Sequence, residues 1–133
     1  MNKVLFICAE NAGRSQMSEA FFNHYNKSTE WSAESYGTMP AKEINRRVAE
    51  AMKELGIDIG NKSPALFDPS TVESYDRIIS YGCLVKGLFS SAVQAKIEEW
   101  SVNNPKDKSI EEVRKIRDEI KEKVLTLLKE VSL

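Results

Sequence analysis

The sequence predicts an α/β fold of three layers, in which a parallel sheet of four strands lies between two layers of helices. Short apolar segments of strand length alternate along the chain with longer segments whose apolar residues recur every three or four positions. The first short segment, residues 4–7, is apolar throughout, which is typical of a strand buried on both faces of a parallel sheet. Parallel strands need crossover connections of one hand, so helices are expected on both faces.

Two strands and two helices are expected in the first half of the chain. A strand over residues 3–7 is followed by a helix over 15–26 and by a second strand over 30–35. A second helix is expected over 42–55, because apolar residues there are spaced by four, four and three positions. Gly56 supports its end, since glycine is favoured just after the last turn of a helix.

The second half is expected to supply two shorter strands and one long helix. Residues 77–81 and the less regular segment 97–100 are the third and fourth strands. Ser109, followed three positions later by Glu112, forms a capping box at the start of a helix. An apolar stripe over 110–131 predicts that final helix, and its charged residues are expected to face the solvent.

Length and composition are those of one globular domain, residues 1–133. The 19 basic and 20 acidic side chains leave a formal charge of −1, which argues against a general binder of nucleic acid or of membrane surfaces. The apolar run before Glu10 is too short for a signal sequence or a membrane span, so a cytoplasmic location is expected. Two cysteines are not the disulfide framework of a secreted domain; each is expected to be catalytic, redox-active or buried.

A thiol and a guanidinium frame the loop between the first strand and the first helix. Cys8 ends the strand, and five residues separate it from Arg14. Backbone N–H groups of such a loop turn inward, and the positive end of the following helix faces the same centre. Arg14 adds a planar fork of donors for a tetrahedral anion, and the same field favours a Cys8 thiolate. The candidate oxyanion-binding and loop-support residues are Glu10, Asn11, Ala12, Gly13, Arg14 and Ser15.

The simpler alternative for this motif is a buried cysteine beside an arginine in the first helical turn. The second cysteine bears on the choice. Cys83 follows the third strand, and ligands of parallel sheets bind beyond the carboxyl ends of the strands. Cys8 and Cys83 are therefore expected at one edge of the sheet, where they would form a candidate redox pair, although the sequence does not fix the distance between them.

Several segments resemble one known family. Residues 4–8, Asn11 and Glu19 resemble the opening of the low-molecular-weight protein tyrosine phosphatases, and the run 14–17 is most similar to their arsenate reductase branch. The resemblance covers almost the whole chain and implies the fold of that family, with catalytic roles for Cys8, Arg14 and Cys83. Cys8 would attack arsenate on the Arg14 clamp, and Cys83 would release arsenite.

The resemblance also implies a redox partner. In the resembling reductases a third cysteine carries the disulfide outward to thioredoxin. In this chain the segment 84–91 contains no cysteine, and Ser90 lies near the expected position. Because serine takes no part in thiol exchange, the expected partner is thioredoxin or another thiol reductant that attacks the Cys8–Cys83 disulfide directly or through a small thiol.

A second departure concerns proton transfer. The family places an aspartic acid before a late proline as the general acid, whereas this chain has Asn104 before Pro105. An asparagine gives up no proton, and general acid catalysis contributes about 10²–10⁴ in rate. Asp107 is the candidate substitute if the loop bends differently.

A potassium ion is the one cofactor that the resemblance suggests. Asn11, Glu19, Ser35 and Asp76 match positions that hold potassium in some resembling reductases. The alternative is a hydrogen-bonded network that braces the loop without a metal.

These observations lead to one preferred function and two alternatives. The preferred function is an arsenate reductase that uses Cys8 and Cys83, with arsenate or phosphate as the bound oxyanion and with no nucleic-acid or membrane partner. The second is a protein tyrosine or small phosphoester phosphatase of the same superfamily, in which water resolves the Cys8 adduct. The third is an oxyanion-binding or thiol-sensing module with little turnover.

Overall fold

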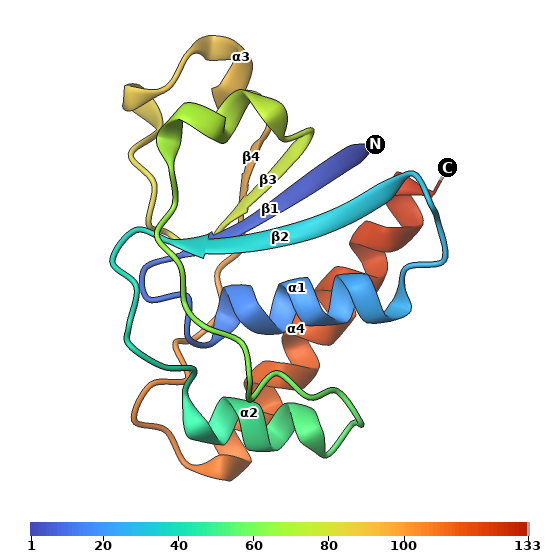
Figure 1. Cartoon of the computed structure of the whole chain (residues 1–133), viewed down its shortest axis with the longest axis vertical. Helices are drawn as coiled ribbons and strands as arrows, with labels where there is room; N and C mark the ends of the chain where they lie inside the picture. The colour runs from blue at the N-terminus through green and yellow to red at the C-terminus, as the bar shows by residue number, and fades with distance from the viewer. Residues whose placement is uncertain (133) are drawn as a thin grey trace.

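The computed structural model describes residues 1–132 and contains one parallel sheet of four strands in the order β2-β1-β3-β4. Figure 1 shows the sheet between two unequal layers of helices. The strands are β1 (Asn2–Cys8), β2 (Trp31–Gly37), β3 (Arg77–Ser80) and β4 (Ile97–Glu99). All three neighbouring pairs are parallel, so the predicted fold class is confirmed.

Three helices cover one face of the sheet and short helical segments cover the other (Figure 1). The first layer consists of α1 (Arg14–Tyr25), α2 (Arg46–Lys53) and α4 (Ile110–Val131); the second contains η1 (Pro69–Ser74), η2 (Lys86–Leu88) and α3 (Ser91–Gln94). Alternate residues of β1 point into the two layers, with Val4, Phe6 and Cys8 in the larger core and Leu5 and Ile7 in the smaller one. The continuous apolar pattern of this strand follows from burial on both faces.

The second helix is shorter than the sequence pattern predicts. It begins at Arg46 rather than at residue 42, because the Asn45 side chain accepts hydrogen bonds from the backbone N–H groups of Arg47 and Val48 and caps the helix there. It ends at Lys53, before the turn that contains Gly56. The final helix is as predicted, and the Ser109 hydroxyl accepts a hydrogen bond from the backbone N–H of Glu112 at its start.

The carboxyl ends of β1, β2 and β3 meet at one edge of the sheet, because Cys8 pairs with Gly37 and Ile7 with Ser80. The loops that leave these strands therefore gather at that edge (Figure 1). Among the helices of residues 1–132, none combines the length and the apolar character needed to cross a membrane.

Candidate active site

Cys8 lies at the floor of this edge, where β1 ends, and only 3% of its surface is exposed. Its sulfur is 2.9 Å from the Ser15 hydroxyl oxygen. That oxygen already accepts a hydrogen bond of 2.7 Å from the Asn11 amide, so the Ser15 proton is free to be donated to the sulfur. Gly13 occupies the N-cap position of α1 and has no side chain to satisfy the first amides of the helix. The thiol therefore lies beside a hydroxyl donor and the positive end of a helix.

Asn11 holds the loop between Cys8 and Arg14 in shape. It is fully buried and has a positive φ of 53°, a conformation that asparagine tolerates better than most residues. Its amide nitrogen also donates to the Ser35 hydroxyl (3.1 Å), and its amide oxygen accepts from the Gln16 side chain (3.1 Å) and from the Ala65 backbone N–H (3.0 Å). One side chain thus ties the loop to α1, to β2 and to the segment before η1.

The end of β2 approaches the same loop so closely that only glycine fits there. A Cβ atom on Gly37 would lie 2.6 Å from the Ala9 carbonyl oxygen. The following segment then holds the loop through three backbone N–H groups, of Met39, Ala41 and Asn45, which donate to the carbonyl oxygens of Ala9, Glu10 and Ala12 at 2.8, 3.0 and 3.0 Å. The loop carbonyls are thereby turned outward, toward this segment.

Arg14 is held by groups that the sequence did not single out. Its Nη1 donates to the Val102 carbonyl oxygen (2.9 Å), and its guanidinium lies over the Tyr81 ring, 5.3 Å from the ring centre. The Tyr81 hydroxyl is 2.5 Å from the Ser18 hydroxyl, and Ser18 donates to the Arg14 carbonyl oxygen, so Tyr81 is the donor to Ser18. Burial raises the pKa of Tyr81 far above its usual value, which keeps this donor protonated.

A hollow of about 340 Å³ opens above Cys8. Its floor is the loop from Cys8 to Arg14, and two walls rise from segments distant in sequence. The wall residues are Ala41, Glu43 and Asn45 on one side and Asn104, Pro105 and Lys106 on the other. The volume is at the small end of the range for small-molecule sites.

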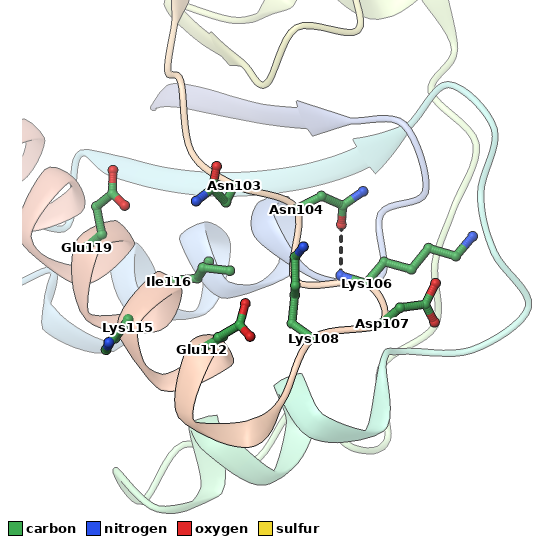
Figure 2. A pocket seen from close by; sticks show the side chains of 9 residues that line it. All are labelled: Asn103, Asn104, Lys106, Asp107, Lys108, Glu112, Lys115, Ile116 and Glu119. Atoms are coloured by element: carbon green, nitrogen blue, oxygen red, sulfur yellow. Dashed lines mark hydrogen bonds between the residues drawn. The ribbon is translucent and has the colours of Figure 1, made fainter.

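The structure separates the two candidates for the general-acid position. Asn104 lines the hollow above Cys8, and its side-chain oxygen accepts a hydrogen bond of 3.1 Å from the Lys106 backbone N–H. Asp107 has a positive φ of 61° and lines a neighbouring hollow of about 620 Å³, together with residues of α4. Figure 2 shows that hollow, with the side chains of Asn104, Lys106 and Asp107 extending to one side of the turn and the residues of α4 on the other. Of the two, only Asn104 lines the hollow that contains Cys8.

Cys83 is a half-buried free thiol three residues beyond β3. Its sulfur is 3.9 Å from the Ser80 hydroxyl oxygen, and Gly82, with a φ of 79°, turns the chain between them. Burial raises the pKa of the Cys83 thiol, and Cys8 is among the groups whose charge raises it further. Cys83 and Cys8 thus follow strands that end at the same edge of the sheet, with Cys8 in the larger core and Cys83 packed against the smaller one.

Three of the four residues proposed for a potassium site lie together, and the fourth does not. The Ser35 hydroxyl links Asn11 to Glu19, since it accepts from Asn11 and donates to the Glu19 carboxylate (2.5 Å). Asp76 instead accepts from the Lys3 backbone N–H (2.8 Å) at the start of β1, the opposite edge of the sheet. The prediction that these four residues form one site is wrong, because Asp76 precedes β3 rather than following it.

A lysine side chain supplies a positive charge beside Glu19. Lys62 places its ammonium nitrogen 3.4 Å from the Glu19 carboxylate. Within residues 1–132, no group of three or more His, Cys, Asp and Glu side chains is arranged to hold a metal ion. Asn11, Ser35, Glu19 and Lys62 are linked in sequence by hydrogen bonds and one ion pair.

The sequence analysis missed Tyr81 and Lys106. Tyr81 adjoins the third strand and has no motif of its own, so only its packing against Arg14 identifies it. For Lys106 the available signal is the Glu10 carboxylate in the oxyanion loop, which a nearby cation stabilises; the Lys106 ammonium lies 3.0 Å from it.

Comparison with known proteins assigns the whole arrangement to a family. A model of the low molecular weight phosphotyrosine protein phosphatases matches residues 3–133. The glutaredoxin arsenate reductase of Synechocystis sp. is 30% identical over 99% of this chain and 100% of its own length. Arsenate reductase 2 of Staphylococcus epidermidis is 34% identical over 89% of each chain.

Solved structures agree with this assignment. The crystal structure of an arsenate reductase from Archaeoglobus fulgidus superimposes with a TM-score of 0.81 at 31% identity, covering 95% of this chain and 98% of that one. Both the sequence and the fold therefore place the chain in one group of enzymes. It belongs to the low molecular weight phosphotyrosine protein phosphatase family.

Proposed function

We propose that the chain is an arsenate reductase in which Cys8 is the nucleophile and Cys83 the second redox thiol. The observation that carries this proposal is the pair of free cysteines at one edge of the sheet, one in the oxyanion loop and one in the loop after β3. Hydrolysis of a phosphoester needs only the first thiol. Reduction of an oxyanion needs two, because two electrons must be delivered.

The first step is attack of the Cys8 thiolate on arsenic. The Arg14 guanidinium and the loop amides bind the arsenate oxygens, and the Ser15 hydroxyl stabilises the thiolate until it reacts. A sulfur–arsenic bond forms, and one arsenate oxygen leaves as water after taking up protons. The adduct still contains arsenic(V), so this step transfers no net electrons.

The second step is attack of the Cys83 thiolate on the Cys8 sulfur. A disulfide bond forms, the sulfur–arsenic bond breaks, and its electron pair remains on arsenic, which leaves as arsenite. The two thiols are thereby oxidised by two electrons and arsenic(V) is reduced to arsenic(III). Burial raises the pKa of the Cys83 thiol, so this thiol must first lose its proton to solvent before it attacks.

The third step returns the disulfide to two thiols. Cys83 is the more exposed of the two sulfurs, while the Cys8 sulfur lies beside the Ser15 hydroxyl and the start of α1. A thiol reductant therefore attacks Cys83 and expels Cys8, whose thiolate the loop stabilises. Thioredoxin and a glutaredoxin-type partner both meet this requirement, and the chain has no third cysteine to relay the disulfide.

The phosphatase alternative needs a general acid for the leaving group, and the residues that line the hollow offer none at the expected position. A phosphate monoester requires protonation of its leaving oxygen, and the side chain at that wall is the amide of Asn104. Arsenate loses an oxygen that can carry its own proton. The three steps use no potassium ion, and the Lys62 ammonium lies 3.4 Å from the Glu19 carboxylate.

A single-turnover experiment tests the proposal. The fully reduced protein is mixed with arsenate in the absence of reductant; arsenite and remaining thiols are then counted, and the disulfide is located by mass spectrometry. We expect two thiols lost per arsenite released and a bond between Cys8 and Cys83. Continuous turnover should then be measurable as arsenate-dependent oxidation of NADPH, either with thioredoxin and its reductase or with glutathione, glutaredoxin and glutathione reductase.

The other outcomes point to the alternatives. Release of phosphate from an aryl phosphate, with no arsenite formed, would assign the chain to the phosphatases. Tight binding of phosphate with neither reaction would identify an oxyanion-binding module. Either result would overturn the reductase proposal.

A further inference from the structure

Glu10 is an unexpected residue in a loop that binds an anion. Its carboxylate extends from the floor of the hollow above Cys8, where a negative charge opposes a negative ligand. Lys106, in the wall on the opposite segment, places its ammonium nitrogen 3.0 Å from the Glu10 carboxylate. The hydrogen bond to Glu10 raises the pKa of Lys106, which favours the protonated ammonium in this bridge. This ion pair thus joins the oxyanion loop, which is the floor of the hollow, to the 104–106 segment, which is its second wall.

The wall that carries Lys106 packs directly on the floor at two further points. A Cβ atom on Gly13 would lie 2.8 Å from the Pro105 ring, so this contact leaves no free space. Arg14 also donates to the Val102 carbonyl oxygen at the base of the wall. Near the rim, the joining contact is the Glu10–Lys106 ion pair.

The two walls differ in how firmly they are attached. Backbone hydrogen bonds from Met39, Ala41 and Asn45 fix the first wall to the floor. The second wall is fixed through Val102 and Pro105, and Arg47 of α2 donates to the Lys108 carbonyl oxygen just beyond it. Lys106 itself is held by an ion pair whose side chains are 57% and 37% exposed. Exposed ion pairs are weak, so this is the contact that can open.

The position of the second wall matters because displacement at a tetrahedral centre is in line. The leaving group points directly away from the Cys8 sulfur, and therefore outward between the two walls. For free arsenate that group is a single oxygen. For a phosphate monoester it is an oxygen that carries an organic substituent, which has to fit between the walls.

We propose that the Glu10–Lys106 ion pair determines substrate specificity by holding the 104–106 wall against the oxyanion loop, so that free tetrahedral oxyanions are admitted and organic phosphate monoesters are disfavoured. This inference rests on the proposed function of the Cys8 site and specifies its substrate class. It also gives the carboxylate of Glu10 a role in an anion-binding loop.

Alkylation of Cys8 by two reagents of different size tests the inference without any turnover. In a Cys83→Ser background Cys8 is the only thiol, and iodoacetamide and N-phenyliodoacetamide share one neutral reactive group. The ratio of their rates cancels changes in thiolate content and reports access alone. Relative to the parent, Glu10→Gln and Lys106→Met should each raise the rate ratio of the phenyl reagent to iodoacetamide by about twofold to fivefold, as expected for loss of an exposed ion pair.

Three comparisons separate a bridge from two independent charges. The double variant should show no larger ratio than either single variant, and the reversed pair Glu10→Lys with Lys106→Glu should restore the parent ratio. Protection of Cys8 by inorganic phosphate should improve in Glu10→Gln and weaken in Lys106→Met. Phosphate is small enough to enter in either case, so its affinity depends on the charge removed and not on access. Glu130→Gln breaks a remote Arg77 ion pair of the same 3.0 Å length and should change neither measurement.

The outcomes that overturn the inference differ from those that overturn the reductase proposal. An unchanged ratio in both single variants, or ratios that move in opposite directions, would show that the ion pair does not control access. Absence of arsenite in the single-turnover experiment would reject the reductase function and leave the access ratio as an independent result. The rate of phenyl phosphate hydrolysis should rise in both single variants by a factor similar to that of the alkylation ratio.

Discussion

The two cysteines lie on loops of opposite character. The loop after β1 is held by the four hydrogen bonds of the Asn11 side chain and by three backbone bonds from the segment after β2. The segment after β3 turns at Gly82, contains only the short helices η2 and α3, and exposes Val85 and Leu88 to 64% and 80%. One cysteine is built into a rigid frame and the other is carried by a loosely packed strand end.

This difference fits the two tasks that the proposed reaction sets. Binding and activating an oxyanion needs donors that are already in place, because reorganisation would cost transition-state stabilisation. The second thiol has to approach Cys8, form a bond and then be reached by a reductant, and weakly packed segments permit such motion. Changes to the two regions should therefore have separable effects on binding and on redox turnover.

The largest effect is expected at Cys83. Cys83→Ser should abolish arsenate turnover coupled to any thiol reductant, because a hydroxyl cannot form the disulfide. Protection of Cys8 by phosphate should be unchanged, since the oxyanion loop is untouched. Arsenite release and phosphate protection are measured on the same preparation. Arsenate reduction by the variant at the parent's rate would show that Cys83 is not the redox partner.

The next effect is expected at Asn11, in the rigid loop. Asn11→Ala leaves several buried partners without their hydrogen bonds and should lower the free energy of unfolding by about 2–4 kcal/mol. Phosphate affinity, measured by protection of Cys8 from iodoacetamide, should fall by at least about tenfold, because preorganised donors in such sites contribute that much or more.

A matched control lies in the other region. Ser90 caps the short helix α3 by accepting a hydrogen bond from the Val93 backbone N–H (3.2 Å). Ser90→Ala should cost about 1 kcal/mol of stability, as loss of a cap does, and leave phosphate affinity unchanged. Equal losses of affinity in the two variants would mean that general destabilisation, and not loop geometry, controls binding.

A gain of activity is expected at the wall of the hollow. Asn104→Asp supplies a carboxylic acid beside the site of the leaving group and should raise aryl phosphate hydrolysis by about tenfold or more. Asn103→Asp serves as the control, because this neighbour lines the adjacent hollow with Asp107 (Figure 2). An equal gain from both variants would indicate a general charge effect of the segment.

The parts of this molecule that the sequence predicts well are those governed by local chemistry. The buried run in β1, the Ser109 cap of α4 and the spacing of Cys8 and Arg14 each depend on neighbours in the chain. The predicted start of α2, residue 42, was wrong. The apolar pattern already begins at Ile44, but the Asn45 side chain caps the helix so that it starts at Arg46.

The remaining features depend on contacts between distant segments. The contact of Arg14 with Tyr81 joins residues more than sixty positions apart, and so does the pairing of Asp76 with Lys3. The hydrophobic periodicity of a sequence reports on local secondary structure and does not predict contacts between such distant residues. The position of Asp107 shows the same limit, because this residue adopts a positive φ and lines the neighbouring hollow rather than the one above Cys8.

The smallest expected effect concerns the rate at which Cys83 closes the disulfide, which either ionisation of the thiol or motion of its segment could limit. Burial raises the pKa of this thiol, and the Ser80 hydroxyl, 3.9 Å from the sulfur, opposes the shift. Only the thiolate attacks, so below its pKa the rate of disulfide closure should rise by about tenfold per pH unit.

Ser80→Ala removes the group that favours the thiolate, which raises the pKa further. Closure should therefore be slower by about twofold to threefold at any pH below the pKa and equal to the parent above it, since a weak hydrogen bond to sulfur accounts for no more. Stopped-flow measurement of thiol loss after mixing with arsenate, over about pH 7 to 10, gives both profiles. If motion of the segment limited closure instead, the rate would not depend on pH and the variant would match the parent throughout. That result would place the control of the second step in the looseness of the strand end rather than in its ionisation.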